Sequence, residues 1–215
     1  MADPFAASLA CISGVTRVVA DAPLALLTTF RTGGPADWLV EVATGEALAA
    51  VLQAAARARQ PVTMLGGGSN ILVGDRGIRG VVVRARLTAI EPVDGGVRAG
   101  AGVTINGLVR WTVGRGLAGL EAWAGTPGTV GGAVYGNAHY GGRNIGDLVT
   151  RVGLIDRDGR RLEAAGTALG FAYDTSRLQW TGERLVWAEF GLTTGEPEAL
   201  RAVARASLAH RKRTQ

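Results

Sequence analysis

Residues 65–70 of the chain read Leu-Gly-Gly-Gly-Ser-Asn. Consecutive residues without a Cβ let the backbone turn several N–H groups toward one point, as in an anion-binding nest, and Ser69 and Asn70 add side-chain donors. The stretch lacks the Gly-Lys-Ser/Thr ending of a Walker loop, and a strand-like run, Ile71–Val73, follows it where a Rossmann fingerprint requires a helix. The sequence therefore allows two interpretations, a phosphate cradle and a simple hairpin turn.

A second glycine-rich stretch spans residues 114–146, and its centre at residues 125–132 reads Gly-Thr-Pro-Gly-Thr-Val-Gly-Gly. It is longer than a turn requires, and it continues into residues 133–138, which are apolar enough to be buried. A buried glycine-rich backbone usually touches a flat or bulky partner, and a close helix–sheet contact is the alternative. The two stretches together predict a ligand with an anionic part and a large planar part, such as a dinucleotide.

The composition indicates a folded protein and argues against nucleic-acid binding. Glycine accounts for 33 of 215 residues, but 47% of the residues are hydrophobic, which excludes disordered low-complexity sequence. The formal charge of +5 comes from arginines spread along the chain, because Lys212 is the only lysine. There is no basic stripe or nucleic-acid motif, and the basic residues at 211–213 are typical of a helix end. We expect no nucleic-acid partner.

The chain has few residues suited to disulfides or metal ions. Cys11 is the single cysteine, and His139 and His210 are the only histidines, so we predict neither an intramolecular disulfide nor a metal site. No basic n-region precedes an apolar run in residues 1–30, and no apolar stretch reaches about 18 residues. We therefore expect a cytoplasmic protein without a membrane span, and we expect a monomer.

The pattern of apolar and turn residues predicts two α/β units. Thr44 and Thr104 can each cap a helix, and Asp158-Gly159 lies between two strand-like runs, which favours a hairpin. We expect strands over residues 36–43, 62–65, 71–73, 80–84, 97–101, 149–156, 160–163 and 185–192, and helices over 46–60, from 104 to 114 or 116, and over 198–211. In the last helix, Leu200, Val203, Ala204 and Leu208 share one face. We divide the chain into an N-terminal extension, 1–23, two subdomains, 24–86 and 87–195, and a final helical region, 196–215.

Three motifs occur in an order typical of one enzyme family. They are Thr-Thr-Phe-Arg-Thr-Gly-Gly-Pro-Ala at residues 28–36, the stretch at residues 65–72, and Gly-Leu-Glu at residues 119–121 followed by residues 125–137. Over about residues 24–215 the sequence resembles the UDP-N-acetylenolpyruvoylglucosamine reductases, also called UDP-N-acetylmuramate dehydrogenases or MurB, which are flavoenzymes of peptidoglycan synthesis. The resemblance implies an α+β FAD-binding fold of the vanillyl-alcohol oxidase (PCMH) type, in which two α/β subdomains clasp the flavin.

The resemblance also implies a reaction, a cofactor and partners. In this family a hydride passes from NADPH to FAD and then to the enolpyruvyl double bond of a UDP-sugar, a serine supplies a proton, and an arginine and a glutamate polarise the substrate carboxylate. Residues 66–70 would hold the FAD pyrophosphate, and residues 125–132 would lie along the isoalloxazine and the ribityl chain. The expected FAD-binding residues are Leu65, Gly66, Gly67, Gly68, Ser69, Asn70, Ile71, Leu72, Gly125, Thr126, Pro127, Gly128, Thr129, Gly131, Gly132, Ala133 and Asn137.

The stretch expected to bind the substrate departs from the family pattern. Tyr173 and Ser176 match it, but Asp174 stands where the family has arginine, which reverses the charge next to an anionic substrate. Arg177, three residues further on, is the candidate replacement, and a surface arginine on a turn is the alternative. His139 lies where the family has a small-residue turn, and it is a candidate to face the flavin.

The proton-donating serine and the glutamate cannot be assigned in this chain. In the family they belong to a third, substrate-binding domain, which follows a helix that ends like residues 211–215. We therefore expect the chain to be the FAD-binding part of a longer enzyme, and to bind FAD while turning over the UDP-sugar poorly or not at all. A non-catalytic flavin-binding module and another oxidoreductase of the same FAD fold are the alternatives.

Overall fold

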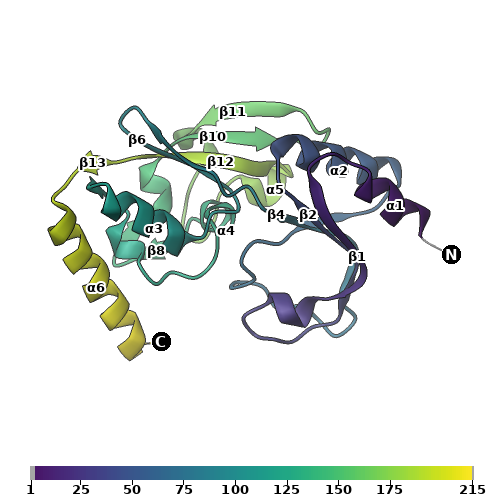
Figure 1. The fold of residues 1–215 in the computed structure, drawn as a ribbon, viewed down its shortest axis with the longest axis horizontal. Coiled ribbons are helices and arrows are strands. Elements are labelled where there is room, and N and C mark those ends of the chain that lie inside the picture. The colour runs from purple at the N-terminus through teal and green to yellow at the C-terminus, as the bar shows by residue number, and fades with distance from the viewer. Residues whose placement is uncertain (1–2, 215) are drawn as a thin grey trace. The chain divides into compact units, whose positions relative to one another are not determined.

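The computed structural model describes residues 3–214, and the chain forms two compact units (Figure 1). Unit 1 consists of Met1–Leu87 and Ile155–Leu162, and unit 2 consists of Thr88–Leu154 and Glu163–Gln215. The chain therefore passes from unit 1 to unit 2 after Leu87, and the tip of one later hairpin belongs to unit 1. Each unit is built on a sheet of its own.

Unit 1 contains a four-stranded sheet and two α-helices. Its elements are α1 (Pro4–Ala10), β1 (Val15–Pro23), the 3-10 helix η1 (Leu24–Leu27), β2 (Pro35–Val42), α2 (Gly45–Arg57), β3 (Val62–Met64) and β4 (Ile78–Ala85). The strand order is β1-β2-β4-β3, in which β2, β4 and β3 are parallel and β1 is antiparallel to β2. Much of the N-terminal extension expected above therefore belongs to this unit, as α1 and β1.

The helix α2 forms as its sequence predicts. The Thr44 side chain accepts a hydrogen bond from the Ala47 N–H at 3.1 Å, and Glu46 lies in the first turn, where its charge suits the helix dipole. The expected apolar face, which includes Leu48 and Val51, is fully buried. The cap and the apolar spacing thus agree on where this helix begins and on which side it packs.

The connection between β3 and β4 is an irregular crossover, residues 65–77. Adjacent parallel strands need a long connection of this kind, and it is usually a helix. This crossover contains neither a helix nor a strand, so the strand expected at Ile71–Val73 was wrong. The side chains of Leu65, Ile71 and Val73 instead pack in a cluster on one face of the sheet. The buried members of this cluster are Ala22, Leu24, Ala36, Leu39, Leu65, Val73 and Val82.

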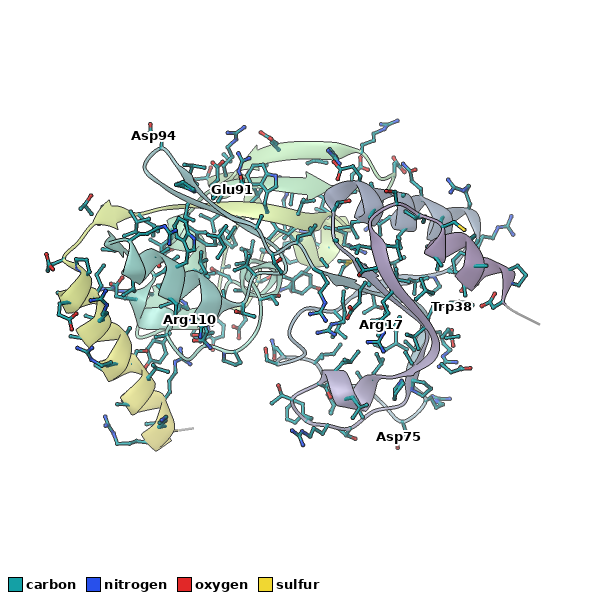
Figure 2. The ribbon with its side chains drawn as sticks, in the orientation of Figure 1. Arg17, Trp38, Asp75, Glu91, Asp94 and Arg110 are labelled. Atoms are coloured by element: carbon teal, nitrogen blue, oxygen red, sulfur yellow. The ribbon has the colours of Figure 1, made fainter. Side chains whose placement is uncertain are left out.

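The opposite face of the sheet carries Trp38, because side chains alternate along a strand and the neighbouring Leu39 belongs to the cluster. Trp38 Nε1 donates a hydrogen bond to the Asp3 carboxylate, and the Trp38 ring meets Phe5 edge-on with ring centroids 5.0 Å apart. The helix α1 therefore docks on this face, where Figure 2 labels Trp38. The loops pack on the face that carries the cluster.

Unit 2 contains a five-stranded sheet in the order β11-β10-β12-β6-β5. These strands are β5 (Ile90–Val93), β6 (Gly96–Gly100), β10 (Val149–Ile155), β11 (Arg161–Ala165) and β12 (Arg184–Gly191). Two short strand pairs are β7 (Leu117–Ala118) with β13 (Thr193–Thr194), and β8 (His139–Tyr140) with β9 (Arg143–Asn144). The helices are α3 (Ile105–Gly114), α4 (Val130–Tyr135), α5 (Leu178–Thr181) and α6 (Pro197–Thr214), with 3-10 turns η2 (Glu121–Trp123), η3 (Ile145–Leu148) and η4 (Gly166–Leu169).

Two local predictions in this part of the chain are confirmed. The Thr104 side chain caps α3 by accepting a hydrogen bond from the Gly107 N–H at 3.1 Å. The hairpin that joins β10 to β11 is closed by a hydrogen bond from the Asp156 N–H to the Arg160 carbonyl at 2.9 Å. Its turn places Gly159 at φ +82°, a conformation that favours glycine.

The helix α6 packs through a narrower stripe than its sequence predicts. Leu200 and Ser207 are buried, but Val203 and Leu208, which were expected on the buried face, are 46% and 41% exposed. The reason is a close polar contact, since the Ser207 hydroxyl donates to the Ala122 carbonyl at 2.7 Å. A small polar residue therefore sets the side on which α6 approaches η2, and Val203 and Leu208 stay partly exposed to solvent.

Residues 3–214 contain neither a membrane-spanning α-helix nor a metal-binding cluster of acidic, His or Cys side chains. None of the helices in this range is long and apolar enough to cross a membrane. The same range contains no group of three or more His, Cys, Asp or Glu side chains placed to hold a metal ion.

Candidate functional site

The first glycine-rich segment presents a run of unpaired backbone donors. None of the seven N–H groups from Gly66 to Leu72 donates a hydrogen bond to any residue in the described range 3–214. Consecutive free N–H groups are what an anion-binding nest offers, and a buried one such as that of Gly68 is costly without a partner. The hairpin interpretation was wrong, because β3 and β4 run parallel. The geometry therefore favours the phosphate cradle.

Contacts within unit 1 fix the shape of this segment. Gly68 has φ +70°, and a Cβ there would lie 1.9 Å from the Leu27 carbonyl oxygen. The Thr29 N–H also donates to the Gly68 carbonyl at 2.9 Å. Gly68 is therefore required by the contact between two backbones, whereas Gly66 and Gly67 are exposed and remain available to a ligand.

The other residues of the first segment divide between core and surface. Leu65 is buried in the cluster, and Ile71 is half-buried against it. Ser69 is half-buried and Asn70 is exposed, while Leu72 is 73% exposed. The segment is thus anchored by Leu65 and Ile71, and its polar side chains lie between these anchors.

The second glycine-rich segment is more tightly packed than the first. The Gly131 N–H donates to the Ala101 carbonyl at 2.8 Å, and the Gly128 carbonyl accepts from the Ile105 N–H at 3.1 Å. A Cβ on Gly131 would lie 3.1 Å from the Ala101 oxygen, so the close intrachain contact that was the alternative is present here. The N–H groups of Gly128 and Thr129 donate to no residue in the described chain.

The helix α4 begins within this second segment. The Thr129 side chain caps it by accepting a hydrogen bond from the Gly132 N–H at 3.4 Å. Gly132 and Pro127 are exposed, and a Cβ on Gly132 would meet only the Thr129 hydroxyl, at 3.8 Å. Ala133 is buried behind them. Space for a ligand therefore remains at Gly132 but not at Gly131.

Two helices hold the start of the second segment. The Gly125 N–H donates to Asn106 Oδ1 at 2.6 Å, and Arg211 Nη2 donates to the Thr126 hydroxyl at 2.8 Å. The Arg211 guanidinium also lies 3.8 Å from the centroid of the Tyr140 ring. Sequence reasoning missed Asn106 and Arg211 as supports, because no local pattern signals a contact between residues 19 or 85 positions apart.

Asn137 serves the packing of unit 2. Its Nδ2 donates to the Ala172 carbonyl at 2.8 Å, and its Oδ1 accepts from the Gly146 N–H at 3.0 Å. The residue is 3% exposed and adopts φ +45°, a conformation that asparagine tolerates better than most residues. Both ends of the Asn137 amide are therefore already used within unit 2.

Tyr173 and Asp174 form the tip of a tight turn. The turn is closed by paired hydrogen bonds between the backbones of Ala172 and Thr175, at 3.1 and 3.3 Å. Asp174 Oδ1 lies 3.3 Å from His139 Nδ1, and the rings of His139 and Tyr173 lie 4.8 Å apart. His139 is thus held by this turn, and Tyr173 is 77% exposed.

Ser176 and Arg177 are engaged by the protein itself. The Ser176 hydroxyl is buried and donates to the Tyr135 carbonyl at 2.8 Å. Arg177 donates through Nε and Nη2 to the Glu183 carboxylate at 2.9 and 3.0 Å, and through Nη1 to the Ala168 carbonyl at 3.0 Å. This geometry favours a structural role for Arg177 over the capture of a substrate carboxylate.

Comparisons with known proteins identify the family. The sequence model of the FAD binding domain matches residues 36–165. The crystal structure of UDP-N-acetylenolpyruvylglucosamine reductase (MurB) from Thermus caldophilus matches at a TM-score of 0.77 and 31% identity, over 92% of this chain and 69% of that chain. The chain belongs to the MurB family. It contains the FAD-binding domain of a MurB-type oxidoreductase, as its motifs predicted.

Other relatives define how much of a MurB protein the chain represents. The UDP-N-acetylenolpyruvoylglucosamine reductase of Anaeromyxobacter sp. (strain K) is 42% identical over 197 residues, which are 91% of this chain and 59% of the relative. The chain thus spans about three-fifths of the length of this MurB relative. A 6-hydroxy-D-nicotine oxidase from Arthrobacter nicotinovorans shares the fold, with a TM-score of 0.69 at 18% identity over 90% of this chain and 44% of that one. The predicted fold, a mixed α/β FAD-binding fold of the PCMH type, is confirmed.

Proposed function

We propose that this chain supplies the FAD-binding part of a UDP-N-acetylenolpyruvoylglucosamine reductase. The complete reaction would use NADPH and FAD to reduce UDP-N-acetylglucosamine enolpyruvate to UDP-N-acetylmuramate in peptidoglycan synthesis. The observation that carries the proposal is the run of unpaired N–H groups from Gly66 to Leu72, in a chain of the MurB family with an FAD binding domain. Neutral donors in such a row bind the oxygen atoms of a diphosphate.

The residues of unit 1 fit the phosphate end of FAD. Gly66 and Gly67 are exposed and carry free N–H groups, and Ser69 and Asn70 add a hydroxyl and an amide beside them. Gly68 keeps the segment bent through its contact with Leu27. These residues would bind and orient the diphosphate with little rearrangement, because their shape is already fixed by the protein.

The residues of unit 2 fit the flavin end. Gly128 and Thr129 keep free N–H groups, and Gly132 leaves the space that a side chain would fill. Thr126 is held by Arg211, so the loop is positioned before a ligand arrives. These residues would hold the flavin, whose chemistry when bound would be hydride transfer between NADPH and the substrate.

A flavin-binding module without this turnover is the second candidate. The observation that favours it is the occupation of the expected substrate groups, since Ser176 donates to Tyr135 and Arg177 is paired with Glu183. Asp174 also places a carboxylate where an anionic substrate would be repelled. Tyr173 remains exposed and accessible to a substrate.

The test begins with the purified 215-residue protein. It should be yellow and release FAD on denaturation, and FAD at about 100 times its dissociation constant should add about 2.7 kcal/mol to the free energy of unfolding. Gly67→Asp should weaken FAD binding, because a carboxylate would then face the diphosphate. Gly74→Asp is the matched control, since Gly74 lies in the same crossover with nothing within 4 Å of its Cβ position.

A colourless protein that FAD does not stabilise would overturn the proposal. If FAD binds, NADPH oxidation that depends on the UDP-enolpyruvyl sugar would support the reductase. FAD binding without this dependence would support the non-catalytic module instead.

A further inference from the structure

The cluster face of the unit 1 sheet also carries a row of charged side chains. Arg17 on β1 lies in register with Glu41 on β2, and Glu41 lies in register with Arg84 on β4. These residues share a face with the cluster, because Leu39 and Val82 belong to it and lie two positions away along β2 and β4. Figure 2 labels Arg17 on β1.

Glu41 is the centre of this row. Its side chain is only 10% exposed, and Oε1 accepts hydrogen bonds from Arg84 Nη1 at 3.0 Å and from Arg86 Nη2 at 2.9 Å. Arg17 has no carboxylate partner among residues 3–214. Two guanidinium groups therefore share one carboxylate, and that of Arg17 beside them has none within the described range, so most of the positive charge of the row is left uncompensated.

Burial and the charges of the neighbouring arginines lower the pKa of Arg84. Burial is the main cause that lowers the pKa of Arg84, and the charge of Arg86 lowers it further, while Glu41 opposes both effects. Arg17 adds to the lowering. Positive charges held this close together favour the binding of an anion beside them. Arg86 is 48% exposed and Arg17 is exposed, so both are accessible to such an anion.

The row lies where the crossover leaves the sheet. The Leu65 N–H donates to the Val83 carbonyl at 2.8 Å, which places Leu65 beside β4 at the residue that precedes Arg84. The unpaired N–H groups begin at the next residue, Gly66. Glu41 and Arg84 also lie at the carboxyl ends of parallel strands, where open α/β sheets bind their ligands.

We propose that Arg17, Arg84 and Arg86 form a second anion-binding element of unit 1, whose ligand is the diphosphate of the dinucleotide. This inference rests on the proposed function, since the same diphosphate would bind the N–H groups from Gly66 to Leu72. The N–H groups supply direction but no net charge, and the arginines supply the charge. Glu41 is the positioning residue that holds Arg84 and Arg86 together.

The test compares ligands with and without a diphosphate. Dissociation constants of FAD, ADP and riboflavin are measured with the 215-residue protein and with Arg86→Gln and Arg17→Gln. Each variant should raise the dissociation constants of FAD and ADP by at least about tenfold, the effect of losing one charge-assisted contact. The dissociation constant of riboflavin should stay unchanged. Arg57→Gln, which removes the same charge from the exposed last turn of α2, should change each constant by less than about twofold.

Salt dependence and thermal unfolding complete the experiment. The variants should show a weaker loss of FAD affinity with rising salt than the parent protein, because fewer charges take part. If Arg86→Gln unfolds because its ion pair with Glu41 is lost, Arg17→Gln carries the test, since Arg17 has no carboxylate partner within residues 3–214.

Two results would overturn the inference even if FAD binds. One is an unchanged affinity for FAD and ADP in both variants, and the other is an equal loss for riboflavin, which would assign the row to folding alone. A parent protein that binds ADP through Arg86 but does not bind FAD would overturn the proposed function and support this site. A parent protein that binds neither ligand would overturn both.

Discussion

Gly68→Ala tests whether the crossover is shaped by contact between two backbones. The Cβ of an alanine at this position would lie 1.9 Å from the Leu27 carbonyl oxygen, whereas Cβ contacts in proteins essentially never fall below 3.0 Å. The two backbones would therefore have to separate by about 1 Å, the difference between these distances. That movement would break the hydrogen bond from the Thr29 N–H to the Gly68 carbonyl.

The expected loss of stability follows from two costs and one gain. A left-handed alanine costs about 1–2 kcal/mol, and a lost backbone hydrogen bond costs about 1 kcal/mol. The lower conformational entropy of the unfolded chain with alanine stabilises the folded state by about 0.4–1 kcal/mol. The net loss is about 2 kcal/mol, which for a domain of this size lowers Tm by roughly 4–8 °C.

Thermal unfolding followed by circular dichroism measures this change. Gly74→Ala is the control, because it lies in the same crossover, has no positive φ and leaves its Cβ position free of atoms within 4 Å. The control should shift Tm by less than about 2 °C. A Tm of Gly68→Ala within about 2 °C of the parent, or an equal loss in the control, would refute the backbone contact as the reason for Gly68.

Two further predictions concern unit 2 and α1. Arg211→Gln should loosen the loop at Thr126 and lower Tm by about 2–4 °C, the effect of roughly one hydrogen bond, whereas the exposed Arg213→Gln should not. The hydrogen bond from Trp38 is the main cause that lowers the pKa of Asp3 from 3.8, so this carboxylate stabilises the fold above its ordinary pKa, and that contribution is lost as the pH falls through the lowered value. Asp3→Asn should therefore flatten the dependence of Tm on pH below about 4, and an unchanged acid dependence would contradict this assignment.

The sequence predicted the helix starts and the hairpin turn that depend on contacts between residues close together in the chain. Thr44 and Thr104 cap their helices, and Asp158-Gly159 turns its hairpin, because each of these contacts spans a few residues. The strand β1 was missed, since a strand at this position is defined by its pairing with β2 rather than by its own pattern. Ile71–Val73 shows the converse error, because Ile71 and Val73 of this short apolar run pack on the cluster without a partner strand.

The two glycine-rich segments look alike in sequence, yet the structure separates their roles. In the first segment the N–H groups from Gly66 to Leu72 donate to no backbone carbonyl within residues 3–214, so they stay available to an anion. In the second segment the strand-to-helix connection at residues 100–105 runs alongside and binds the backbone of Gly128 and Gly131. Glycine content cannot distinguish these cases, because the distinction depends on which distant backbone lies beside each segment. Substitutions at Gly131 therefore test packing first, and substitutions at Gly67 test the ligand.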